Sequence, residues 1–145
     1  MKAILASWQF WALLSATFAA LTAIFGKIGV ENINSDFATL IRTVVILAVA
    51  ATIVAAMRTY QPLGSVSPRT YLFLVLSGIA TGASWLCYYR ALQLGPAARV
   101  APIDKLSVVL VAVLGVMLLG EKLAPRNWLG VALIAAGAML VAFEA

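Results

Sequence analysis

The sequence predicts an all-α, polytopic membrane protein with about five transmembrane helices, and three observations support this prediction. Apolar residues make up 64% of the chain and charged residues only 10%, with a mean hydropathy of +1.06. An average soluble domain is roughly 45–50% apolar and about 25% charged. Long apolar runs also alternate with short polar connections. A small soluble fold could not hide so much apolar surface, whereas a bilayer solvates it.

Five apolar runs are long enough to cross a bilayer. A hydrocarbon core of ~30 Å requires roughly 20 helical residues at ~1.5 Å each. Each span must be a helix, because lipid offers no partner for backbone polar groups. We expect helices over residues 8–26, 37–57, 70–89, 100–119 and 128–143, all in one domain of residues 1–145.

Polar and turn-forming residues mark the ends of these spans. Ser35 or Asp36 could cap the second helix, and Ser67 or Pro68 could open the third. Gly95-Pro96 separates the third span from the fourth. The connections are all short, so we expect no soluble domain between spans.

The basic residues lie singly at span ends, and the net charge is +5. We therefore expect contacts with lipid head groups and no nucleic-acid partner. The side of the N-terminus holds Lys2, Arg58, Arg69, Lys122 and Arg126, and the other side holds Lys27, Arg90 and Arg99. This bias favours a cytoplasmic N-terminus and a multi-pass protein of the cytoplasmic (inner) membrane. Counting Arg42 and Lys105 removes the bias, so insertion in both orientations is a second hypothesis.

Reactive side chains are scarce. The chain has one cysteine, Cys87, and no histidine, so no intrachain disulfide or Cys/His metal site is expected. We expect no cofactor and no catalytic residue, and Cys87 is predicted to be a small buried packing residue. Lys2 and the first apolar run also permit a cleaved signal peptide, but the run is long for one and we expect it to be retained.

Three ionisable residues fall inside predicted spans: Arg42, Asp104 and Lys105. Each costs at least ~2.5 kcal/mol on insertion scales. Arg42 and Asp104 are predicted roughly 6–8 Å below the starts of their spans, on the same side of the membrane. An Arg42–Asp104 ion pair is therefore allowed. Asp104 and Lys105 are adjacent, so they should point ~100° apart and not share a helix face.

These charges have two interpretations. They could line a polar path for a solute or proton, or the bases could snorkel to the interface while the helix dipole stabilises Asp104. Pro102 could break or kink the fourth span, although a proline in a first turn is also ordinary. Trp85 and Tyr89 could stack on an organic solute or anchor the interface.

Small residues occur at helical spacing in two spans. Gly78 and Gly82 in the third span, and Gly130 and Gly137 in the fifth, allow close approach of a second helix. We expect these four glycines to pack helices, either within one protomer or between two.

The second half of the chain carries a series of short motifs. They are RALQLGPA at 90–97, VAPIDKLS at 100–107, GEKL at 120–123, and Trp128 followed by Gly130, Leu133, Ile134 and Gly137. This series resembles the EamA domain of the drug/metabolite transporter superfamily, in a short single-domain form. The resemblance implies a secondary transporter of a small metabolite or amino-acid-like solute, not an enzyme. It implies a structural or capping role for Glu121.

A typical member of that family carries two such domains in opposite orientation. One five-span domain is half of such an inverted-repeat transporter. The resemblance therefore implies a homodimer or pairing with a similar five-span protein. An alternative is a non-transporting assembly or regulatory membrane protein. Small multidrug exporters of the superfamily use an acid in their first span, and the first span here has none.

The candidate path residues are Arg42, Asp104, Lys105, Trp85 and Tyr89. Two bases against one acid favour an anionic or zwitterionic solute. An intramembrane enzyme is disfavoured, since the chain lacks evident acid–base or metal machinery.

Overall fold

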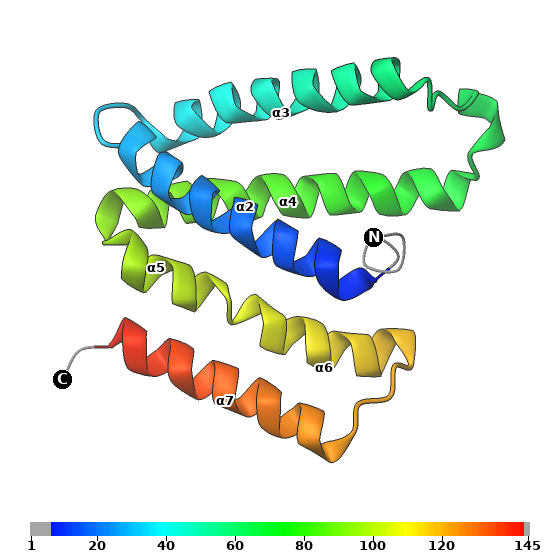
Figure 1. Cartoon of the computed structure of the whole chain (residues 1–145). Coiled ribbons are helices and arrows are strands. Elements are labelled where there is room, and N and C mark those ends of the chain that lie inside the picture. The colour runs from blue at the N-terminus through cyan, green and yellow to red at the C-terminus, as the bar shows by residue number, and fades with distance from the viewer. Residues whose placement is uncertain (1–6, 144–145) are drawn as a thin grey trace. The chain divides into compact units, whose positions relative to one another are not determined.

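A computed structural model describes residues 7–143, and every regular element in that range is a helix. The elements are α2 (Trp8–Gly29), α3 (Ser35–Met57), the 3₁₀ helix η1 (Leu63–Ser65), α4 (Pro68–Leu94), α5 (Ala97–Asp104), α6 (Ser107–Leu119) and α7 (Pro125–Ala142) (Figure 1). The segments α5 and α6 together make one apolar stretch, so five helical stretches are long and apolar enough to cross a membrane. The predicted five-span, all-α fold is confirmed. Lys2, counted above, lies outside the described residues.

The chain divides into two parts, and each is described by itself. The middle part comprises residues 26–93, and the terminal part combines residues 7–25 with residues 94–143. The middle part contains the last turn of α2, all of α3 and nearly all of α4. The terminal part contains the rest of α2 together with α5, α6 and α7.

The start of α3 is fixed by an asparagine cap. Asn34 has extended backbone, and its Oδ1 accepts hydrogen bonds from the amides of Asp36 at 2.8 Å and Phe37 at 3.3 Å. Such a cap satisfies amides that the first helical turn leaves free. The prediction that Ser35 or Asp36 is the cap was wrong, because Ser35 is already the first helical residue.

The buried residues of the middle part gather at the start of α3 and near the end of α4. Ser35, Ala38 and Thr39 are buried, and their spacing places them on one helix face. Figure 1 shows α3 and α4 running side by side. From α4, Tyr89 and Leu92 are buried, Leu92 completely. This packing explains why α4 continues to Leu94, five residues beyond the predicted end, since residues after Tyr89 contribute to the core.

The last turn of α2 approaches α4 closely at a glycine. A Cβ added to Gly26 would lie 3.3 Å from the Tyr89 hydroxyl and 3.4 Å from Leu92 Cδ1. A side chain here would compete for space with both core residues.

At the other end of α4, Ser67 Oγ accepts a hydrogen bond from the Thr70 amide at 3.1 Å, which confirms the predicted opening of this helix.

The fourth span is interrupted at Lys105 and Leu106, between α5 and α6 (Figure 1). The amides of Leu106, Val108 and Val109 bond to the carbonyl three residues back, each at 3.0 Å, rather than four. Pro102, inside α5, removes one more helical hydrogen bond because it has no amide hydrogen. The span is therefore two short helices joined by a tighter turn.

The terminal part closes with a glycine turn between α6 and α7. Gly120 ends α6 with φ 69°, a left-handed conformation that favours glycine. The Glu121 amide then bonds to the Gly115 carbonyl at 3.2 Å. A Cβ added to Gly115 would lie 2.8 Å from the Glu121 carboxylate. Glu121 thus folds back onto α6, in agreement with a structural role.

Candidate solute-binding site

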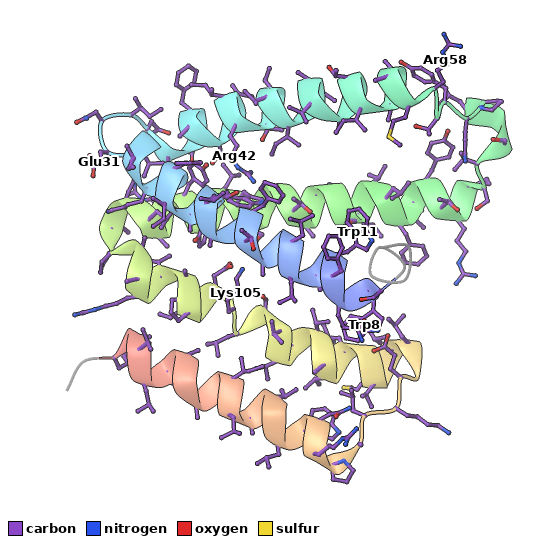
Figure 2. The ribbon with its side chains drawn as sticks, in the orientation of Figure 1. Trp8, Trp11, Glu31, Arg42, Arg58 and Lys105 are labelled. Carbon is purple, nitrogen blue, oxygen red and sulfur yellow. The ribbon has the colours of Figure 1, made fainter. Side chains whose placement is uncertain are left out.

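Arg42 lies on the stripe of α3 that faces α4. It is the eighth residue of α3 and seven residues after the buried Ser35, so the two share a helix face. Its Cα lies about 10 Å along the helix from the first residue, at ~1.5 Å per residue. This is farther from the start of its helix than predicted, because α3 begins two residues earlier than the predicted span. Figure 2 shows the Arg42 side chain pointing from α3 toward α4.

The guanidinium of Arg42 stacks on the aromatic residues of α4. Its carbon lies 3.3 Å from the centroid of the Trp85 ring and 5.9 Å from that of Tyr89. A cation over an aromatic face is stabilised by about 2 kcal/mol when desolvated. Insertion scales assign about 2.5–3.5 kcal/mol to an arginine at a helix centre. The rings therefore offset a large share of the cost of holding Arg42 at this depth.

Trp85, Tyr88 and Tyr89 form one aromatic cluster, because residues three and four apart share a face of α4. The Trp85 and Tyr89 rings lie 5.7 Å apart at 62°, and the Trp85 and Tyr88 rings 5.4 Å apart at 85°. These edge-to-face contacts fix the indole that carries Arg42. Tyr89 is only 5% exposed. Its ring therefore belongs to the core of the middle part, not to a surface belt of interface anchors.

Within the described part of the chain, the charge of Arg42 is stabilised by rings and not by an acid. Among residues 7–143, the ion pair within 4.0 Å joins Lys105 and Asp104 and does not involve Arg42. Stacking uses the flat face of a guanidinium and leaves its N–H edges directed outward, where a planar acid can be bound by two parallel hydrogen bonds. The structure thus brings together three of the predicted path residues, Arg42, Trp85 and Tyr89, in an arrangement that can receive an anionic group.

A second polar layer, which was not predicted from the sequence, lies between the end of α4 and the α2–α3 loop. Gln93 Nε2 donates to the carbonyls of Ile33 at 2.6 Å and Val30 at 3.2 Å. Lys27 Nζ donates to the Leu92 carbonyl at 2.7 Å. These bonds fasten the loop to α4 on the same side as the start of α3. Polar residues at the end of an apolar run are usually interface residues, so no local pattern indicated that these residues pair.

Asp104 and Lys105 lie at the interruption of the fourth span, in the terminal part. Lys105 Nζ lies 3.1 Å from Asp104 Oδ2, and the side chains are 55% and 33% exposed, respectively. Lys105 Nζ reaches the carboxylate of its neighbour, although the Lys105 amide still bonds to the Ala101 carbonyl at 3.1 Å, as in a regular helix. The expectation that the two side chains point ~100° apart stays a prediction. Because Arg42 belongs to the other part, its pairing with Asp104 stays a prediction.

The small residues predicted to pack helices have open surroundings. Within its own part, no atom lies within 4 Å of a Cβ added at Gly78, Gly82, Gly130 or Gly137. Their packing role, within one protomer or between two, stays a prediction. Cys87 is exposed, which corrects the expectation that it is buried: it lies on a face of α4 next to the aromatic cluster.

Comparison with known proteins places these features in a family. The family model for EamA-like transporters matches residues 6–143. A protein of Sinorhizobium sp, named an uncharacterized transporter in the cobO 3′ region, is 71% identical over 136 residues, covering 94% of this chain and 96% of the relative. No solved structure matches the chain. The chain therefore belongs to the EamA-like transporter family and is a multi-pass membrane protein.

Proposed function

We propose that this protein is a secondary transporter of the cytoplasmic membrane that moves a small solute bearing an acidic group, such as an amino-acid-like metabolite. The proposal depends on one observation: Arg42 is held within a span by aromatic rings, with no carboxylate bound to it among the described residues. A permanent charge in a span is costly and usually functional. The acid of the solute supplies the missing counter-charge.

The interrupted fourth span supplies a second polar element of the proposed path. Discontinuous helices often carry the solute and ion sites of transporters. Here the interruption exposes the Asp104–Lys105 pair and releases carbonyl groups from the regular helical pattern. We propose that this pair lines the path.

The protein is proposed to work as a homodimer, or with a similar five-span partner. The Sinorhizobium relative is matched over 96% of its length, so that protein has about the length of one such domain. An inverted-repeat transporter needs two such domains. Two copies inserted in opposite orientations would provide them. Crosslinking in native membranes should recover dimers, and recovery of monomers alone contradicts this arrangement.

Flux measurements test the transport role. The full-length protein is reconstituted into vesicles and assayed with radiolabelled amino acids of different charge. We expect saturable uptake that falls at least tenfold in Arg42→Ala and in Trp85→Ala, since tenfold corresponds to about 1.4 kcal/mol. The control is Arg58→Asn, which removes a base from the other end of α3 and suits the left-handed backbone at that residue.

Unchanged flux in both Arg42→Ala and Trp85→Ala contradicts the site. Absence of flux for every solute, together with copurification of one fixed partner, supports the alternative of a non-transporting assembly protein.

A further inference from the structure

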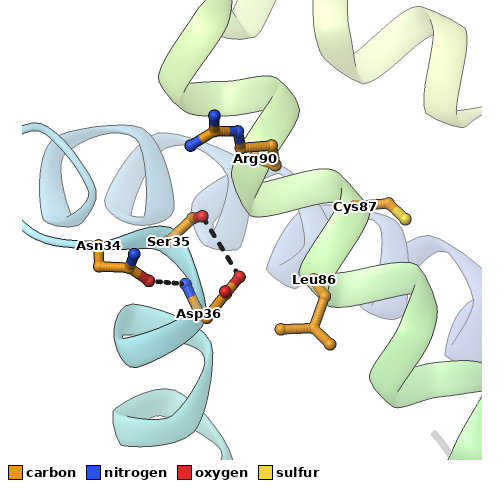
Figure 3. Close-up of a pocket in the computed structure, with 6 residues that line it drawn as sticks. All are labelled: Asn34, Ser35, Asp36, Leu86, Cys87 and Arg90. Atoms are coloured by element: carbon orange, nitrogen blue, oxygen red, sulfur yellow. Dashed lines mark hydrogen bonds between the residues drawn. The ribbon is translucent and has the colours of Figure 1, made fainter.

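A hollow of about 360 Å³ lies between the start of α3 and the second half of α4. We propose that it binds a small zwitterion, with the ammonium group on Asp36 and the acidic group on Arg90. The residues that line it are Asn34, Ser35, Asp36, Leu86, Cys87 and Arg90 (Figure 3). All of them belong to the middle part. The proposal deepens the proposed function, on which it rests, by naming a separate site for the solute.

The two charged residues of the hollow have room for a ligand. No ion pair within 4.0 Å joins Asp36 and Arg90 in the described chain. The Asp36 carboxylate has one long contact, 3.5 Å from Ser35 Oγ, and Arg90 makes one long hydrogen bond, 3.4 Å to Gln93 Oε1. A carboxylate accepts about four hydrogen bonds and a guanidinium donates five. Both groups therefore retain most of their capacity.

The arrangement fixes the direction of the ligand. The amides of Asp36 and Phe37 at the start of α3 are already bonded to Asn34 Oδ1, so they are not free for an anion. The Asp36 carboxylate would also repel an anion there. The acidic group therefore goes to Arg90, the ammonium group to Asp36, and the apolar body lies against Leu86 and Cys87.

Gln93 is a positioning residue for Arg90. Its amide nitrogen is bonded to the carbonyls of Ile33 and Val30, so its amide oxygen is turned toward the Arg90 guanidinium. This chain of bonds holds the cation of the hollow at a fixed place relative to the α2–α3 loop.

The hollow adjoins the proposed path. Leu86 and Arg90 each follow a member of the aromatic cluster, Trp85 and Tyr89, by one residue on α4, which is a rotation of about 100°. A solute in the hollow therefore lies one helix face away from Arg42.

The same chemistry could come from two sources, a free amino acid or the head group of phosphatidylethanolamine, because both join a primary ammonium to an acidic group. Cys87 allows both to be tested, since it is exposed, lines the hollow and is the single cysteine of the chain. Its rate of modification by a methanethiosulfonate reagent reports occupancy.

The test uses the purified full-length protein in an uncharged maltoside detergent. L-leucine at about 10 mM, roughly tenfold above the upper end of the usual KM range, should slow labelling of Cys87 about tenfold at about ten times its Kd. 3-Methylbutylamine and 4-methylpentanoate, which each lack one charged group of leucine, should protect weakly. A second arm replaces leucine by phosphatidylethanolamine in the micelle. Protection by leucine identifies a soluble solute, and protection by the lipid alone identifies the head group.

Asp36→Asn and Arg90→Gln should each abolish protection, whereas Glu31→Gln, which removes an acid from the neighbouring α2–α3 loop, should not. Gln93→Ala should weaken protection, and Leu86→Trp should fill the hollow and block it with both charges intact. The site is contradicted if neither compound protects, if the single-charge analogues protect equally, or if protection survives both charge substitutions. Flux separates the two proposals: Arg42-dependent flux without protection contradicts only the hollow, and protection without flux contradicts only transport.

Discussion

The guanidinium carbon of Arg42 lies 3.3 Å from the centroid of the Trp85 ring, which joins α3 to α4 through a cation and an aromatic face. The contact lies within two membrane-spanning helices of the middle part. Water is scarce at such depth, so the attraction between cation and ring is weakly screened. The pair therefore stabilises the fold and holds the charge in place for a ligand.

The energetic coupling of Arg42 and Trp85 is the first prediction. In a double-mutant cycle of Arg42→Ala and Trp85→Ala, the free energy of unfolding in mixed micelles should reveal a coupling of about 1–2 kcal/mol. The control cycle combines Arg42→Ala with Tyr60→Ala, because the Tyr60 side chain is 70% exposed. It should be additive within about 0.5 kcal/mol. Additivity in both cycles is incompatible with a stabilising stack.

The close approach at Gly26 gives the second prediction. Gly26→Val should destabilise the protein by about 1–3 kcal/mol, because it overpacks the core against Tyr89 and Leu92. The control is Gly29→Val in the same helix, where an added Cβ meets nothing within 4 Å. The milder Gly26→Ala should be relieved by Tyr89→Phe, since the hydroxyl is the nearest atom at 3.3 Å. Equal losses at Gly26 and Gly29 are inconsistent with this packing.

The proline of the fourth span gives the third prediction. Pro102→Ala restores an amide that can bond to the Ala98 carbonyl, so it should raise helix content by circular dichroism and increase thermal stability. Pro125→Ala should have little effect, because Pro125 is at the first turn of α7, where the amide has no helical partner. If the interruption matters for transport, Pro102→Ala should also lower flux. A loss of stability in Pro102→Ala contradicts the prediction.

The cap of α3 gives the fourth prediction. Asn34→Ala removes the acceptor of two amide hydrogen bonds and should cost about 1 kcal/mol of unfolding free energy. Asn34→Asp should retain most of the stability, since a carboxylate caps equally well. Asn32→Ala in the same loop serves as the control. A cost for Asn32→Ala equal to that for Asn34→Ala argues against a specific cap.

The hydropathy of the sequence was sufficient to predict all five spans, because lipid imposes a simple rule of length and apolarity. The predicted ends of the helices were less accurate than the predicted number of spans. Because Arg90 and Gln93 are polar, the third span was predicted to end at Tyr89. The helix α4 instead continues through both residues to Leu94. Their polarity indicated the membrane surface, whereas their helical position is fixed by the packing of Leu92 and by bonds to the α2–α3 loop.

The candidate site was predicted in part for a similar reason. Arg42, Trp85 and Tyr89 were selected because charge and aromatic rings within apolar runs are conspicuous. The hollow beside Asp36 and Arg90 was missed, because its residues are ordinary when considered singly. Only the antiparallel pairing of α3 with α4 brings the beginning of one helix to the end of the other, and pairing of distant segments is not encoded in local composition.

The interruption at Lys105 and Leu106 has a mechanical consequence. A continuous helix is stiff, so a tilt of one end also displaces the other end. Because the ladder of hydrogen bonds is interrupted there, a tilt of α5 need not be transmitted in full to α6. The interruption directly follows Asp104 and includes Lys105. A bend at this point would therefore change the direction of these two charges without moving the whole span in the lipid.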